Sequence, residues 1–327
     1  MGSHYTIFGR PISLFTRKLE AAMQFYGAAF TVEPKRDENR EAIEQRAGTH
    51  QIPVLQTPEN WMLADTTPIF MLLDTRFVQR RLFPPGPLGV LVHIVEEVLD
   101  EWVARVMVHY RWHYAENTQA VVSEILEREV SLEEARKFPL AQWGPRACRA
   151  TGTETPTQQI SAEREYISIL EALATQLKET TFSLGNRPAA VDTALIGGLR
   201  GHTNRDPLPD LSEFATVLEW DQAAAEFSGS TGDWANFPHS TPFAQHVLKL
   251  ALDEYKPFVL GNRTALANGD KAFVVNTYGE QVSYLCRAYP ERSRQMVAGH
   301  IEQLAPNDRR EVVDWLAEKG LRECFQR

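Results

Sequence analysis

Residues 5–26, YTIFGRPISLFTRKLEAAMQFY, indicate how the fold of this chain begins. The first four residues are aromatic or β-branched, which is typical of a strand, and Gly9 and Pro11 interrupt the run. From Ser13 onward, apolar side chains recur with helical spacing until Gly27, and glycine commonly ends helices. The stretch therefore predicts a strand, a loop and a helix.

The residues that follow continue this alternation of strands and helices. They comprise expected strands at 30–33, 53–56 and 61–63 and expected helices at 38–47 and 68–77. Gly48 ends the first of these helices, and Pro68 lies in the first turn of the second. The first segment therefore predicts the order β-α-β-α-β-β-α.

A Pro/Gly cluster at 83–87 is the best domain boundary in the sequence, because the strand signals stop there. Helical periodicity follows at 90–114, 116–137, 161–179, 192–202 and 211–227, which predicts a helical bundle. Beyond it we expect a helix at 242–255, strands at 272–276 and 281–287, a helix from 290 and a helix at 308–319. The predicted domains are therefore 1–83, 88–235 and 236–327, the last a small α+β extension packed on the helical domain.

Composition narrows the possible functions. The chain has 34 Lys and Arg residues and 43 Asp and Glu residues, which gives a net charge of −9. This negative charge disfavours binding to nucleic acid or to an anionic membrane. Hydrophobic residues make up 43%, yet no apolar stretch approaches the roughly 20 residues that cross a bilayer, and the N-terminus has no signal-peptide pattern. Three scattered cysteines predict reduced thiols, so we expect a cytoplasmic protein.

Several motifs in this order resemble the cytosolic glutathione S-transferase superfamily, of a bacterial type. They are TIFG with SLFTRK at 6–18, IPVL at 52–55, DTTPI at 65–69, and LGNRP at 184–188 followed by Asp192. The resemblance covers about 240 residues and implies a thioredoxin-like first domain and an all-helical second domain. Residues 236–327 exceed the usual length of the family.

The resemblance implies a glutathione site in the first domain. Ser13 would donate a hydrogen bond to the thiolate, which the partial positive charge of a helix N-terminus also favours. Ser13 as a simple helix N-cap is the alternative. Ile52, before a cis Pro53, would pair its main chain with the cysteinyl unit, Asp65 and Thr66 would bind the γ-glutamyl group, and Gln51 would also contact glutathione.

Departures from the family pattern bear on mechanism. The first domain has no cysteine, and Phe8 stands where tyrosine-type members have their tyrosine, so a serine-type site remains. Asp65 and Thr66 differ from the Glu-Ser pair that is commoner at these positions in the family. Ala189 removes the hydroxyl half of the capping box that Asp192 completes.

The predicted helix at 90–114 carries a polar stripe of Glu97, Glu101, Arg105, His109 and His113. In the family this helix lines the second-substrate cleft, so Arg105, His109 and the neighbouring Tyr110 are candidate binding residues. His109 and His113 are spaced to share a metal, but no third ligand is evident, so no metal is expected.

The resulting hypothesis is a homodimeric, glutathione-dependent transferase that directs an activated thiolate at a small hydrophobic electrophile. The alternative is a catalytically inactive protein of the same fold that serves as a binding or scaffold module.

Overall fold

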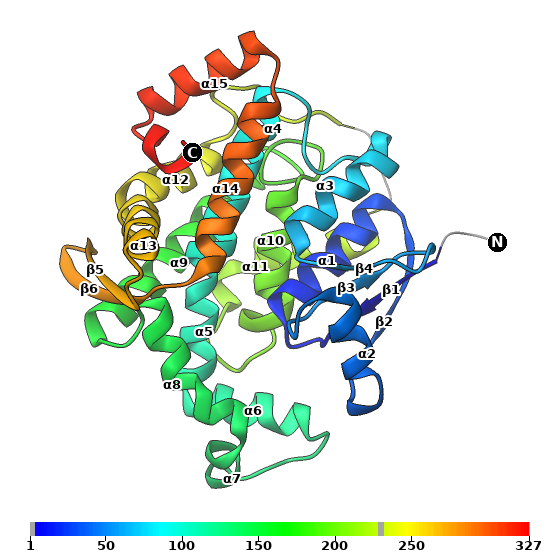
Figure 1. The fold of residues 1–327 in the computed structure, drawn as a ribbon. Coiled ribbons are helices and arrows are strands. Elements are labelled where there is room, and N and C mark those ends of the chain that lie inside the picture. Colours follow the sequence, from blue (N-terminus) through cyan, green and yellow to red (C-terminus); the bar gives the residue numbers. More distant parts are fainter. Residues whose placement is uncertain (1–3, 228–231, 327) are drawn as a thin grey trace.

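The computed structural model describes residues 4–227 and 232–326. Its first part contains the predicted β-α-β-α-β-β-α order (Figure 1). The elements are β1 (His4–Phe8), α1 (Leu14–Tyr26), β2 (Ala29–Glu33), α2 (Asp37–Ala47), β3 (Val54–Gln56), β4 (Met62–Ala64) and α3 (Thr66–Arg76). Helix α3 begins two residues before the predicted start at Pro68. The sheet order is β2-β1-β3-β4, with β1 parallel to β2 and antiparallel to β3, so the thioredoxin-like prediction is confirmed.

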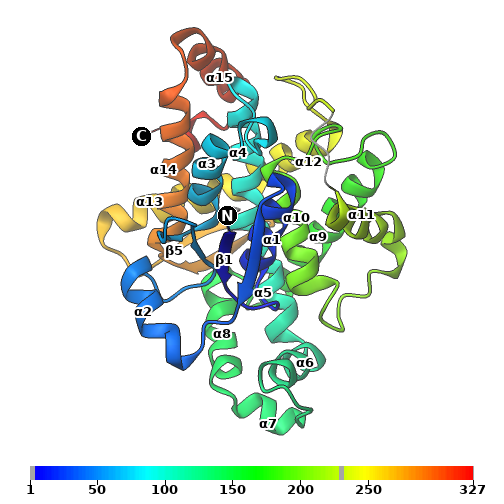
Figure 2. The ribbon, with the colours of Figure 1, turned by 90° about the vertical axis from the view of Figure 1, so that its right-hand side faces the viewer.

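A largely helical part follows, as predicted. It contains η1 (Val78–Arg80), α4 (Pro87–Glu97), the π-helical turn η2 (Val98–Val103), α5 (Ala104–His113), α6 (Ala115–Ile125), α7 (Leu132–Lys137), α8 (Pro139–Thr151), α9 (Pro156–Gln176), α10 (Ala190–Gly198), the π-helical turn η3 (Leu199–Thr203), η4 (Ser212–Phe214) and α11 (Ala215–Glu226). In Figure 2 the strand β1 and helix α1 lie toward the viewer, with α9, α10 and α11 on one side of them.

Several helix boundaries differ from the sequence prediction. The helix expected at 90–114 is divided by the π-helical turn η2, which shifts the angular position of the residues after it. The helix expected at 116–137 is two helices, α6 and α7. Helix α8 was not predicted, because Pro139, Gly144 and Pro145 all signal loops; Pro139 in fact opens the helix.

The last part comprises α12 (Pro242–Leu250), η5 (Ala251–Tyr255), α13 (Lys256–Asn268), β5 (Ala272–Thr277), β6 (Glu280–Leu285), α14 (Ala288–Gln303), α15 (Pro306–Glu318) and η6 (Arg322–Phe325). The strands β5 and β6 form the predicted hairpin. At its turn Tyr278 and Gly279 both have positive φ, 55° and 75°, which is the backbone of a two-residue turn that suits paired strands.

The extension shares its core with the rest of the chain. Val247, Tyr255, Phe258 and Tyr284 are almost fully buried in the same apolar cluster as Trp102. Figure 1 shows α14 running along α4, and the Ser293 hydroxyl on α14 donates a hydrogen bond to the Glu97 carboxylate. The division into three domains stays a prediction, since one cluster runs through all of them. Within the described residues, no helix is both long and apolar enough to cross a membrane.

Candidate functional site

The register of the sheet brings three sequence motifs to one edge. Phe8, the last residue of β1, pairs with Val54 at the start of β3, and Val54 pairs with Ala64 at the end of β4. The loop that leads to Ser13, the Ile52–Pro53 bond and Asp65 each lie directly beyond one of these residues. The three motifs therefore meet at the same end of adjacent strands.

Ser13 is the N-cap of α1. Its backbone is extended, at φ −102° and ψ 123°, and its Oγ accepts a hydrogen bond from the Thr16 N–H at 3.3 Å. The capping alternative is therefore realised. It leaves the hydroxyl proton of Ser13 free of the cap, because the cap uses only an oxygen lone pair. Ser13 can both cap α1 and donate to an anion at the helix N-terminus.

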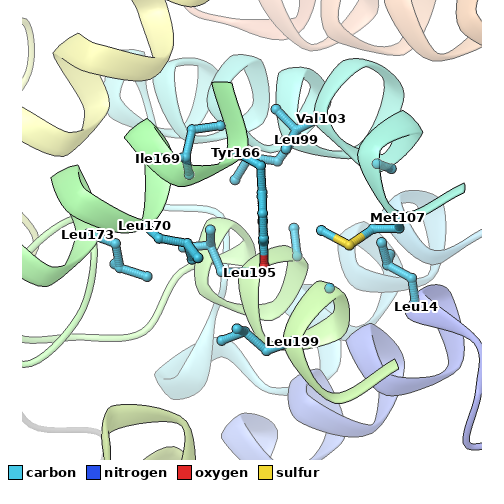
Figure 3. Close-up of a pocket in the computed structure, with 13 residues that line it drawn as sticks. Leu14, Leu99, Val103, Met107, Tyr166, Ile169, Leu170, Leu173, Leu195 and Leu199 are labelled. Atoms are coloured by element: carbon cyan, nitrogen blue, oxygen red, sulfur yellow. The ribbon is translucent and has the colours of Figure 1, made fainter. Parts of the chain in front are cut away.

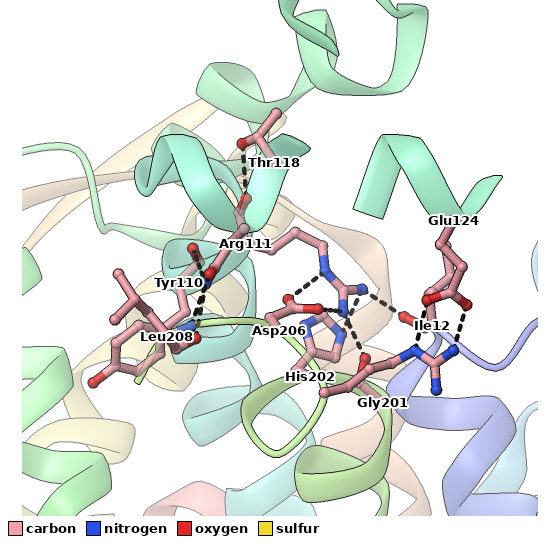
Figure 4. Close-up of polar contacts among 11 residues, drawn as sticks. Ile12, Tyr110, Arg111, Thr118, Glu124, Gly201, His202, Asp206 and Leu208 are labelled. Atoms are coloured by element: carbon pink, nitrogen blue, oxygen red, sulfur yellow. Dashed lines mark hydrogen bonds and ion pairs between the residues drawn. The ribbon is translucent and has the colours of Figure 1, made fainter. Parts of the chain in front are cut away.

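Arg111 on α5 secures the loop before Ser13 (Figure 4). Its guanidinium donates to both oxygens of Asp206, at 2.9 and 3.0 Å, and to the carbonyl oxygens of Ile12 and Gly201. Gly201 lies so close to α1 that an added Cβ would stand 2.7 Å from the Leu14 nitrogen. The helical part therefore positions the start of α1 through a buried ion pair and a close backbone contact.

The Ile52–Pro53 peptide bond is cis, as predicted. Pro53 is buried, Ile52 is half-buried and Gln51 is exposed. Backbone groups just before β3 can pair with an extended peptide in the manner of an added strand.

Asp65 occupies the junction of β4 and α3 with φ at 75°, a left-handed conformation that is uncommon for aspartate. Its side chain does not cap α3, and its Oδ2 is buried with no hydrogen-bond partner, whereas the neighbouring Thr66 is 3% exposed. Tyr289, at the start of α14, faces this carboxylate. Burial, with the charge of Asp65 and a hydrogen bond to it, raises the pKa of the Tyr289 hydroxyl.

A buried ionic cluster joins α1, α3 and the α4–η2 helix beside Asp65. The fully buried Lys18 ammonium donates to the Glu96 and Asp100 carboxylates, and the Thr67 hydroxyl donates to Glu96 at 2.7 Å. Burial raises the pKa of the nearby Glu101 to about 7, against the opposing charge of Arg287. These groups hold the first part against the second.

The three candidate second-substrate residues contact other parts of the helical bundle. Arg105 is 3% exposed and donates to the Glu165 carboxylate on α9 at 2.9 Å, and its guanidinium lies 3.8 Å from the Trp102 ring centroid. The His109 Nε2 lies 2.6 Å from a carboxylate oxygen of Glu163, also on α9. Tyr110 is 4% exposed.

The predicted polar stripe is thus mostly buried, a correction to the expected cleft-facing surface. Glu97, Glu101, Arg105 and His109 each have 8% or less of their surface exposed, and only His113 lies open to solvent. Each buried group except Glu101 has a polar partner far along the chain, for example Tyr255 and Ser293 for Glu97. No group of three metal-binding side chains occurs in the part of the chain that the structure describes.

Sequence reasoning missed Lys18, Asp100, Arg111 and Tyr289. Lys18 lies in a helix whose apolar spacing predicts burial, and a lysine inside such a pattern is the signal that could have pointed to a buried counterion. The partners themselves were not predictable, because Asp206 and Tyr289 lie far from their contacts in sequence.

A small apolar cavity lies in the helical core (Figure 3). Leu14, Met107, Tyr166, Ile169 and Leu195 are among the side chains that line it, and its volume is about 20 Å³. An apolar space of this size holds neither a tripeptide nor a second substrate.

Residues 7–81 match the family described as glutathione S-transferase, N-terminal domain. The search of curated proteins found no match.

Solved structures with a similar fold include a glutathione S-transferase from Methylobacterium radiotolerans JCM 2831 in complex with glutathione sulfonate. The two sequences are 18% identical, the match covers 73% of this chain and 99% of that one, and the TM-score is 0.45. Beta-etherase LigF from Sphingobium sp. strain SYK-6 is 15% identical, covering 70% and 96%, with a TM-score of 0.48. Likeness at this level carries no argument about substrate.

Proposed function

We propose that this chain, whose residues 7–81 match the family of glutathione S-transferase N-terminal domains, is a glutathione-dependent transferase. The observation that carries the proposal is the meeting of Ser13, the cis Ile52–Pro53 bond and Asp65 at one end of adjacent strands. Each of the three motifs carries groups that can bind one part of glutathione. The proposal assigns no metal.

In this assignment the N-terminus of α1 and the Ser13 hydroxyl stabilise the thiolate. The main chain of Ile52 pairs with the cysteinyl unit, and Gln51 and Pro53 border it. The unpartnered Oδ2 of Asp65 accepts from the γ-glutamyl ammonium, while the backbone N–H of Thr66 donates to its carboxylate. The thiolate then attacks an electrophilic carbon, forming a sulfur–carbon bond as the leaving group departs with its electron pair.

The second substrate is a small hydrophobic electrophile bound against the helical part. Arg105, His109 and Tyr110 enter this proposal as side chains that shape α5. The polar groups of Arg105 and His109 already contact α9, and the Tyr110 ring packs against Tyr166 of the same helix. Assembly as a homodimer and a cytoplasmic location belong to the proposal by family analogy alone.

One observation favours the alternative of an inactive, glutathione S-transferase-like binding protein. The Tyr289 hydroxyl faces the same Asp65 carboxylate that the ligand's ammonium would use, and Asp100 and Glu101 lie near it. Nearby acids disfavour a ligand that carries two carboxylates.

Calorimetric titration with glutathione separates the two functions. We expect binding at millimolar ligand or tighter, and about ten- to hundredfold weaker binding by Asp65→Ala, since losing one charged hydrogen bond costs about 1.5–3 kcal/mol. Glu59→Ala, which removes an exposed carboxylate beside Arg76, is the matched control. Absence of binding to the wild type would favour the inactive protein, and equal affinity of the Asp65 variant would remove the γ-glutamyl assignment.

Ultraviolet titration of the bound thiol tests Ser13. The pKa of glutathione bound to the wild-type protein should lie below that of the free thiol, and Ser13→Ala should reverse part of this shift. If the variant titrates like the wild type, Ser13 is only a cap.

A further inference from the structure

A second, larger pocket opens on the other face of α9. It has a volume of about 420 Å³, within the usual range of small-molecule sites. Tyr166, one residue after Glu165, lines the small core cavity with Leu14, whereas Glu165 lines this larger pocket. Helix α9 therefore separates the pocket from the N-terminus of α1, and nothing in the proposed transferase reaction uses it.

The pocket has two opposed walls and an aromatic end. Helix α9 supplies Ser161, Arg164, Glu165 and Ser168. The facing wall consists of α12 and η5, with His246, Lys249, Leu250, Asp253 and Glu254, and Tyr278 from the hairpin turn closes one end. The extension thus builds half of the pocket.

The Tyr278 end is rigidly held. The hydroxyl of Tyr278 donates to Glu165 at 2.6 Å, and its backbone N–H donates to the Glu254 Oε2 at 2.8 Å. Behind it Arg105 lies 5.0 Å from the ring centroid and donates to Glu165. The Glu165 carboxylate, which also accepts from the Trp102 Nε1–H, therefore has protein partners on both oxygens and an ion pair with Arg105.

Most remaining polar groups of the walls satisfy one another. Lys249 pairs with Asp253. Ser168 Oγ donates to the Glu165 carbonyl oxygen at 2.8 Å and lies 3.1 Å from His246 Nε2, so this imidazole supplies the proton of their contact. Two groups of opposite charge are left for a ligand. They are Arg164, which has no ion-pair partner among the described residues, and Glu254, whose Oε1 makes none of the hydrogen bonds described above.

We propose that this pocket binds a small zwitterion of the α-amino acid class. Arg164 on one wall takes the carboxylate, which a guanidinium recognises through two parallel hydrogen bonds. Glu254 on the facing wall takes the ammonium. The Tyr278 ring and Leu250 contact the apolar side chain of the ligand. Burial raises the pKa of Glu254 to about 7, and an ammonium beside this carboxyl would favour its charged form.

The test uses three probes that share a phenylethyl group: L-phenylalanine, 3-phenylpropanoate without the amine, and phenethylamine without the carboxylate. Each is titrated calorimetrically into the full chain. We expect phenylalanine to bind at least about tenfold more tightly than either single-charge probe, because only phenylalanine engages both walls.

Two variants assign the charges. Arg164→Gln should weaken phenylalanine and 3-phenylpropanoate about tenfold and leave phenethylamine unchanged. Glu254→Gln, whose amide oxygen can still accept from the Tyr278 N–H, should weaken phenylalanine and phenethylamine only. Arg146→Gln, an exposed arginine on α8, is the charge-matched control and should change none of them.

The proposal is overturned if phenylalanine binds no better than 3-phenylpropanoate, if Arg164→Gln and Arg146→Gln behave alike, or if phenylalanine does not bind at millimolar concentration. Asp65→Ala should leave phenylalanine binding intact, so this test and the glutathione titration fail independently.

Discussion

Replacing Arg111 by methionine perturbs the buried bridge that holds the loop before Ser13. Arg111 is 4% exposed, and it donates twice to Asp206, which is 8% exposed. Methionine keeps part of the aliphatic stem but leaves this carboxylate without its cation. Removing one partner of a buried ion pair costs about 3–5 kcal/mol, so we expect the free energy of unfolding to fall by about 4 kcal/mol.

The assay is urea denaturation followed by tryptophan fluorescence, with the free energy extrapolated to water. Arg128→Met is the control, because the Arg128–Glu134 pair is exposed and pairs of that kind contribute about 0–1 kcal/mol. A second variant, Arg111→Met with Asp206→Leu, removes both charges. It should be more stable than Arg111→Met alone, since no unpaired carboxylate stays buried.

Two results would refute this reasoning. The first is a loss for Arg111→Met no larger than that for Arg128→Met. The second is a double variant less stable than the single one, because a buried unpaired Asp206 carboxylate would then not be what destabilises Arg111→Met.

Three further outcomes are expected. Burial lowers the pKa of both His93 and His300, whose Nδ1 atoms lie 3.2 Å apart. Their contribution to stability is therefore retained above the unfolded pKa near 6.5 and lost as the pH falls below it. In melts at acid pH, His93→Leu should reduce the slope of stability against pH by up to about 1.4 kcal/mol per pH unit. Truncation before Asn236 uncovers core side chains worth about 1.5–3 kcal/mol each, and a soluble product with an unchanged Tm would contradict the shared core. If the proposed function holds, Tyr289→Phe should tighten glutathione binding several-fold by freeing Asp65, and calorimetry showing equal affinity would exclude that competition.

The element order of the first part could be predicted from local signals alone. Strand and helix periodicities, with Gly27 and Gly48 as left-handed helix ends, depend on residues close together in sequence. The resemblance carried by the IPVL and DTTPI motifs likewise needed no coordinates. It pointed to the cis Ile52–Pro53 bond, which the structure contains.

The environment of the candidate sites was decided by tertiary contacts. The polar stripe on the long helix has the pattern of a solvated face, yet α9 and the C-terminal extension pack over it, and Glu97 and Arg105 become buried. Their partners, Tyr255 and Glu165, lie 158 and 60 positions away. Local periodicity reports which side chains share a face, but only the packed chain determines whether that face meets water or a counterion from a distant segment.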